Sequence, residues 1–125
     1  MQIDVREHSG NLSRWTREHF GDNAYDLRTI VPEGCEEQGF FFEFLVYRSF
    51  RVQISLGFSS RFKDGIIYLY VYVGGKPEML DGLTKRKDEV CLSYNREAIL
   101  NNLEILDEYL QWRMTDAQKK TFGLI

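Results

Sequence analysis

The chain has 125 residues, of which 43% are hydrophobic and 28% are charged, and its formal net charge at pH 7 is −3. This size and composition predict one globular domain over residues 1–125. A nucleic-acid surface needs concentrated Lys and Arg, so the acidic balance argues against nucleic acid as the main partner. No stretch approaches the roughly 18 apolar residues of a membrane span. The polar start of the chain gives no sign of a signal peptide, so we expect a cytoplasmic protein that does not bind membranes.

The first third of the chain predicts a short helix followed by a strand. Asn11 is a favourable N-cap for a helix over Leu12–Phe20, and Gly21 ends it. Tyr25–Val31 has the composition of a strand, which the segment beginning at Pro32 breaks. Its side chains alternate between two faces, with Tyr25, Leu27 and Thr29 on one face and Asp26 and Arg28 on the other.

Three apolar runs of strand length then follow, Phe40–Tyr47, Val52–Phe58 and Ile66–Val73. They predict an antiparallel meander. Its inner face is formed by alternating apolar residues: Phe40, Phe42, Phe44, Val46, Val52, Ile54, Leu56, Phe58, Ile67, Leu69, Val71 and Val73. Gly74–Pro77 is expected to end the meander, and Val90–Tyr94 is a candidate for a further strand at the sheet edge.

The strongest helix signal lies at Arg96–Arg113, which Asn95 is placed to cap. Its apolar stripe at i+3 and i+4 spacing consists of Ile99, Leu103, Leu106, Leu110 and Met114. Thr115 and Gln118 fit a capping box that starts a last short helix. The long stripe is the one cover large enough for the sheet. The fold class is therefore predicted as α+β, an antiparallel β-meander of about four to six strands with the long C-terminal helix and the short N-terminal helix packed on it.

The residues that commonly carry chemistry are few and scattered. His8 and His19 each follow a glutamate, which would suit an acid–base pair, but we interpret them instead as an exposed terminal histidine and a histidine on a helix face. Cys35 and Cys91 are expected to be free thiols, since nothing indicates an oxidising compartment. No zinc spacing, nucleophile motif or phosphate-binding loop is present. The sequence predicts no catalytic residue, metal or cofactor, and a protein that is not an enzyme.

The most informative feature is the row of Tyr68, Tyr70 and Tyr72, which alternation places on the outer face of the sheet. Tyr and Arg are enriched at binding hot spots. The predicted partner-binding residues are Tyr68, Tyr70, Tyr72, Tyr47, Arg51, Glu43, Glu36 and Glu37, with Phe41, Leu45 and Gln53 nearby. Two alternatives compete with this hypothesis. The N-terminal helix or a terminal segment covers this face, or cross-strand Tyr pairs simply stabilise the sheet.

In size and layout, the chain resembles the small α+β immunity proteins of bacterial contact-dependent inhibition and polymorphic-toxin systems. Those proteins share no motif, so the resemblance assigns no site residue. It implies a protein-binding inhibitor of a cognate toxin, cytoplasmic and without enzymatic activity. An aromatic and acidic surface would complement a basic toxin domain.

Two further functions remain open at the level of sequence. A secretion chaperone of the type III kind is also small, acidic and α+β, although no clear helix is predicted between the strands here. A small nuclease-like enzyme would have to use His8 or His19. The oligomeric state is left open, and an obligate dimer would favour the chaperone.

Overall fold

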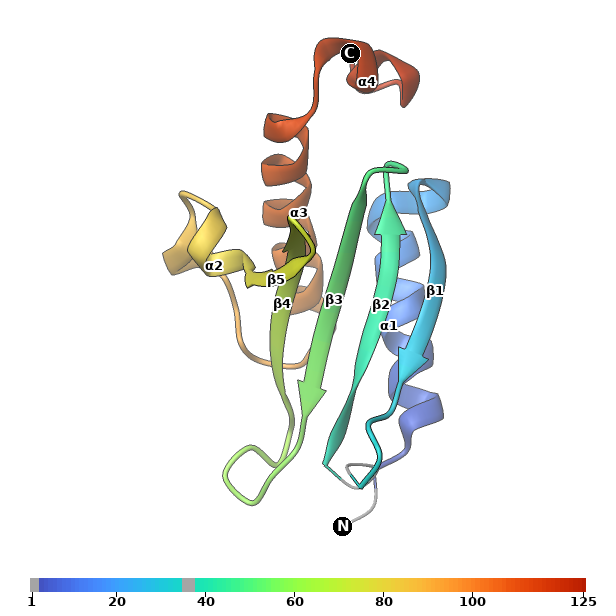
Figure 1. The fold of residues 1–125 in the computed structure, drawn as a ribbon. Helices are drawn as coiled ribbons and strands as arrows, with labels where there is room; N and C mark the ends of the chain where they lie inside the picture. Colours follow the sequence, from blue (N-terminus) through green and yellow to red (C-terminus); the bar gives the residue numbers. More distant parts are fainter. Residues whose placement is uncertain (1–2, 35–37) are drawn as a thin grey trace.

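The computed structural model describes residues 3–34 and 38–125. The elements in chain order are α1 (Val5–Phe20), the 3-10 turn η1 (Gly21–Asn23), β1 (Ala24–Ile30), β2 (Gly39–Val46), β3 (Phe50–Gly57), β4 (Ile66–Val73), β5 (Lys76–Met79), α2 (Leu80–Leu83), the 3-10 turn η2 (Lys87–Glu89), α3 (Arg96–Arg113) and α4 (Asp116–Thr121). The strands form one antiparallel five-stranded sheet in the order β1-β2-β3-β4-β5. Helices α1 and α3 lie side by side on one face of it (Figure 1). The predicted α+β meander is confirmed.

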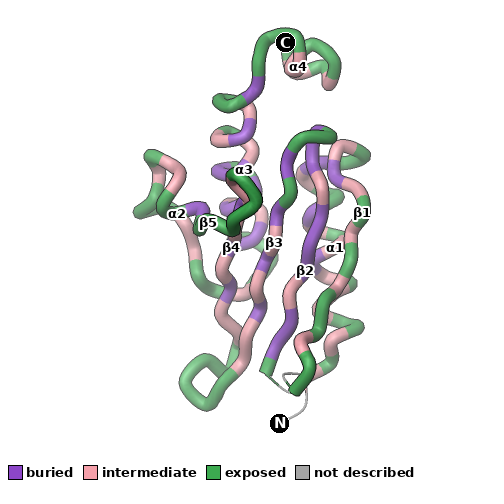
Figure 2. The backbone as a smooth tube through the Cα atoms, in the orientation of Figure 1, coloured by how far each residue is buried: buried purple, intermediate pink, exposed green. Residues whose placement is uncertain are grey.

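The core lies between α3, α1 and the inner face of the sheet. Leu103, Leu106 and Leu110 of α3 are fully buried, as are Val52 and Val71 of the central strands. Figure 2 shows the alternation along β3, where buried residues follow half-buried or exposed ones. Full burial of such a side chain contributes about 1.5–3 kcal/mol, so the predicted stripe holds α3 on the sheet.

Helix α1 begins seven residues earlier than the predicted Leu12, at Val5. The N-cap is Asp4, whose carboxylate accepts a hydrogen bond from the backbone N–H of Glu7 at 3.1 Å. The predicted cap, Asn11, lies inside the helix and donates its side-chain amide to the Tyr94 hydroxyl at 3.2 Å. The first turn of α1 packs against the core, and this packing outweighs the unfavourable helix propensity of Ser9 and Gly10 in the interior of the helix. The predicted end at Gly21 is confirmed.

The meander continues past the point where the sequence predicted its end. Gly74 and Gly75 have φ values of 59° and 82°, as a two-residue hairpin turn requires. They reverse the chain into β5, which pairs with β4. Pro77 is tolerated there because β5 is an edge strand. The predicted edge strand at Val90–Tyr94 is reduced to a single bridge between Ser93 and Ile66.

The C-terminal helices agree with the sequence in bounds and caps. The Asn95 side chain accepts the backbone N–H of Ala98 at 2.8 Å, and the capping box of Thr115 and Gln118 is formed. Asn102 is an unpredicted buried polar residue of α3, and its amide bonds both the N–H and the carbonyl of Cys91 at 2.8 Å. It thereby fixes the segment before α3.

Two sequence expectations concern thiols and membranes. Cys91 is a free thiol, as predicted, whereas Cys35 lies outside the described residues. Within residues 3–34 and 38–125, no helix is both long and apolar enough to cross a membrane.

Candidate functional site

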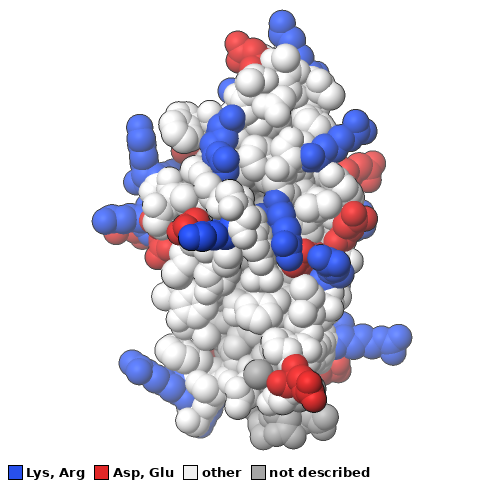
Figure 3. Space-filling model, in the orientation of Figure 1, with Lys and Arg blue, Asp and Glu red and all other residues white. Residues whose placement is uncertain are grey.

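The face of the sheet that lies opposite α1 and α3 is named the open face. The strand register arranges its side chains in three rows: Ile30, Phe41, Ser55 and Tyr68; then Arg28, Glu43, Gln53, Tyr70 and Met79; then Tyr25, Leu45 and Arg51, beside Tyr72 and Pro77. The first row carries no charge and the other two do. Figure 3 shows the same division, an uncharged area over the lower sheet and charges of both signs above it.

The three predicted tyrosines remain partly exposed on the open face. Tyr68, Tyr70 and Tyr72 are each half-buried, and Ile30 and Met79 on the same face are 37% and 36% exposed. Both long helices pack on the other side, so the alternative that the N-terminal helix covers the tyrosines is wrong. Tyr68 lies opposite Ser55 and Tyr70 opposite Gln53, so these two do not form cross-strand aromatic pairs with β3.

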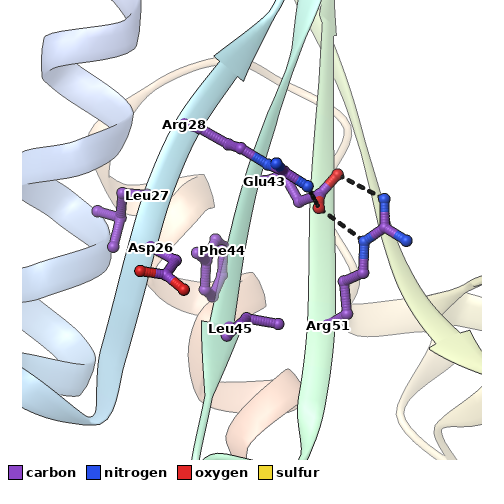
Figure 4. Close-up of a pocket in the computed structure, with 7 residues that line it drawn as sticks. All are labelled: Asp26, Leu27, Arg28, Glu43, Phe44, Leu45 and Arg51. Carbon is purple, nitrogen blue, oxygen red and sulfur yellow. Dashed lines mark hydrogen bonds and ion pairs between the residues drawn. The ribbon is translucent and has the colours of Figure 1, made fainter.

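Glu43 lies at the centre of the open face and is held by two arginines. Arg51 donates to it through Nε at 2.6 Å and Nη2 at 2.9 Å, and Arg28 donates through Nη2 at 2.7 Å (Figure 4). The hydrogen bonds from Arg51 lower the pKa of Glu43 against the opposing effect of burial, and Arg28 adds to this effect. Arg51 also lies over the Tyr72 ring, 4.1 Å from its centroid. This network fixes Arg51 in one orientation.

Glu43 was predicted as a partner-binding residue, but it is buried and ion-paired on the open face and presents no free carboxylate to a partner. Glu43 is 2% exposed, and its charge is matched by that of two arginines. A carboxylate that is buried on a sheet face needs such partners, because an unpaired buried charge is strongly destabilising. The side chains of Arg28 and Arg51 are 63% and 44% exposed, so the charge that reaches solvent at this point is positive.

A β-bulge explains why Arg28 reaches Glu43. Tyr25 pairs with Leu45 and Arg28 with Glu43, so β1 has one more residue than β2 between these pairs. Asp26 lies at this bulge and has a φ of 53°. The simple alternation predicted for β1 placed Tyr25 and Arg28 on opposite faces, whereas the bulge brings both to the open face. Next to it, Asp26 lines a hollow of about 490 Å³ together with both arginines (Figure 4).

Tyr47 does not belong to the open face, which corrects another prediction. It is 2% exposed, packs on Phe20 and Phe122, and donates its hydroxyl to Asp107 Oδ1 on α3 at 2.6 Å. Burial, and then the bond to Asp107, raise the pKa of its phenol. The reason is local, because Tyr47 and Arg48 both have positive φ in the β2–β3 turn, which ends the alternation of β2.

The two histidines lie apart and have separate partners. They are about three helical turns, or roughly 16 Å, apart along α1. His8 Nδ1 is 2.7 Å from the Tyr94 hydroxyl, and His19 Nε2 is 2.9 Å from Asp107 Oδ2. His8 was expected to be an exposed terminal residue, but it is half-buried on α1. Among the described residues, no group of three His, Cys, Asp or Glu side chains could hold a metal ion.

Three further partner-binding residues were predicted, Arg51, Glu36 and Glu37. Arg51 lies on the open face as expected, and Glu36 and Glu37 lie outside the described residues. Tyr25, Arg28 and Met79 also lie on the open face but were not predicted there, because their placement depends on the bulge and on β5. Comparisons of this chain with protein-family models, with curated proteins and with solved structures find no match.

Proposed function

We propose that this protein is a protein-binding inhibitor of the immunity-protein type, which acts in the cytoplasm and neutralises a cognate toxin by binding it through the open face. The observation that carries the proposal is a sheet face with a row of partly exposed tyrosines beside an arginine held in one orientation. Large aromatic side chains offer contact area at low entropic cost, and an ordered Arg51 loses little freedom on binding.

The state of the sheet edges supports binding by the face rather than by strand addition. The outer edge of β1 is distorted by the bulge at Asp26. At the other edge, the Ile67 N–H donates to the Leu92 carbonyl at 2.8 Å beside the Ser93 bridge, and β5 pairs with the last four residues of β4, 70–73. Bulges, short strands and proline protect edges against pairing with another chain.

The charges of the open face shape the kind of contact proposed. Arg28 and Arg51 outnumber the single buried carboxylate between them, with Asp26 at the rim. A basic toxin would therefore have to be attracted by other groups, for which Glu36 and Glu37 are the candidates. The aromatic contacts would supply most of the affinity in this proposal, and charge would set the rate of association.

The test begins with a pull-down of the partner by the wild-type protein, followed by surface plasmon resonance with purified partner. Tyr70→Ala should weaken binding by well over tenfold, since truncation of a hot-spot side chain costs about 2 kcal/mol or more. Phe62→Ala is the matched control, because Phe62 is an aromatic residue that is 40% exposed in the β3–β4 loop and belongs to none of the three rows of the open face. Equal effects of the two changes would contradict binding through the open face.

Co-expression then separates the proposed function from its alternatives. An inhibitor should restore growth to cells that produce the partner, and Tyr70→Ala should lose this protection. A partner that is an exported effector rather than a toxin, together with an obligate dimer in solution, would favour the secretion chaperone instead.

A further inference from the structure

A second surface hollow lies away from the open face, between α3 and the segment that follows α2. It is named the Trp112 hollow and has a volume of about 270 Å³. Its lining residues are Leu83, Thr84, Lys85, Glu108, Tyr109 and Trp112. The surface thus combines apolar and aromatic side chains with one lysine and one glutamate.

The aromatic wall is unusually open to solvent. Trp112 is 75% exposed, the highest value among the exposed large hydrophobic residues of the described chain. Its ring lies 6.2 Å from that of Tyr109, and Arg113 lies over Tyr109 and Phe50 at 5.7 and 5.4 Å from the ring centroids. Trp, Tyr and Arg are the residue types most enriched at binding hot spots.

The opposite wall is held firmly against α3. Leu80 of α2 is buried in the core, and Leu83 packs against it. Arg86 donates to Glu108 at 3.0 Å and to Glu89 at 2.9 and 3.0 Å, which ties the segment to the helix. The hollow is therefore formed before anything binds to it.

The charge balance of the hollow is positive once the internal ion pairs are counted. The carboxylate of Glu108 is engaged by Arg86. Lys85 and Arg113, in contrast, form no ion pair with any residue that the structure describes. Lys85 lines the hollow, and Arg113 lies just outside it, over the ring of the lining residue Tyr109. These two cations complement a ligand that joins an apolar anchor to negative charge.

We propose that the Trp112 hollow is a second protein-binding surface and that its occupant is an acidic peptide segment of a partner, with a Leu or Phe anchor between Asp or Glu residues. The anchor packs on Trp112 and Leu83, and the flanking carboxylates bond to Lys85 and Arg113. Lys85 is the first of three consecutive basic residues, Lys85, Arg86 and Lys87, and the first two have different roles in this proposal. Arg86 holds the wall in place, while Lys85 remains free for a ligand.

The probe for this surface is a phage-displayed library of random peptides. The library is first depleted on Trp112→Ala protein and then selected on the wild type. The recovered peptides should carry Asp or Glu beside Leu or Phe. In a Trp15→Phe background Trp112 is the sole tryptophan, so synthetic versions of these peptides should change its fluorescence directly.

Matched variants separate the hollow from general surface charge. Trp112→Ala should weaken the recovered peptides by about thirtyfold or more, and Lys85→Glu by about tenfold at low salt. The controls are Lys87→Glu, an exposed lysine of the same turn, and Leu92→Ala, an exposed leucine elsewhere. Both controls should change binding by less than about twofold, and circular dichroism should show all four variants folded.

Three results would overturn the inference. The depleted library yields no binder, the recovered peptides lack acidic residues, or Lys85→Glu and Lys87→Glu weaken binding equally. A parallel arm measures binding to phosphatidylcholine vesicles with and without phosphatidylserine. Binding to the anionic vesicles that requires Trp112, without peptide binding, would instead assign the hollow to a lipid surface.

Discussion

The two faces of the sheet arise from the same alternation of side chains but differ in composition and in burial. On the covered face, residues such as Phe42, Ile54 and Val71 are apolar and at most 1% exposed. On the open face, their immediate neighbours are half-buried tyrosines and a carboxylate held by two arginines. A fold needs one apolar face for its core, and hydrophobic burial there is sufficient to hold α3 and α1 in place. The second face is therefore free to carry specificity.

The largest expected effect is on the covered face. Leu106→Ala should lower the free energy of unfolding by about 2–5 kcal/mol, because Leu106 is fully buried and its truncation leaves a cavity. Tyr70→Ala, at the centre of the open face, should cost about 1 kcal/mol, the scale of a cross-strand contact. Urea denaturation measures both. A loss below about 1 kcal/mol for Leu106→Ala would place α3 outside the core and overturn this comparison.

The ion-paired centre of the open face should give the next largest effect. Arg51→Ala removes two of the three hydrogen bonds to a buried carboxylate, and we expect a loss of about 1–2 kcal/mol in unfolding free energy. Arg28→Ala, the control, removes one bond from a more exposed side chain and should cost less than about 1 kcal/mol. Equal losses would mean that the bidentate geometry of Arg51 adds nothing to stability.

Glu43 also illustrates how far sequence reasoning could go. Alternation correctly predicted the face on which Glu43, Arg51 and the row of Tyr68, Tyr70 and Tyr72 lie, and the apolar stripe predicted the helix that covers the other face. Alternation fails where the backbone leaves the regular strand geometry. The bulge at Asp26 and the turn at Tyr47 both depend on positive φ at non-glycine residues, which no period-two pattern encodes.

Gly10 and Pro77 show a second kind of limit. Each disfavours the element in which it lies, and each was accordingly predicted outside a helix or strand. Tertiary contacts outweigh that preference, because α1 packs along its length on the core and β5 has only one neighbour in the sheet. Propensity rules therefore misplaced one helix start and one strand while leaving the architecture correct.

Acid should remove the stabilising contribution of Glu43 at the centre of the open face. The pKa of Glu43 in the folded protein lies below its ordinary value of 4.5, so its ionised form stabilises the fold above that value. This contribution is lost as the pH falls through 4.5 towards the lowered folded pKa. The unfolding free energy of Glu43→Gln should therefore decrease less steeply than that of the wild type between about pH 5 and pH 3, roughly the window in which carboxylates titrate. Urea denaturation at each pH measures this difference. Glu78→Gln, at an exposed position of β5, serves as the control and should follow the wild type.

The smallest expected effect is on the kinetics of partner binding, and it concerns charge rather than packing. Among the described residues, the centre of the open face presents two arginines to solvent and buries its one carboxylate. If the partner is a basic toxin, attraction must come from acidic groups elsewhere. Glu36→Lys with Glu37→Lys should then slow association severalfold at low salt and by less at high salt, where these charges are screened. The dissociation rate should change little, because rim charges act mainly on the encounter.

The matched control is Glu97→Lys with Glu104→Lys, which changes the net charge by the same amount at exposed positions of α3. Surface plasmon resonance at two salt concentrations measures both pairs. Equal slowing by both would assign the attraction to the net charge of the protein, and faster association of the first pair would indicate an acidic partner for the arginines of the open face.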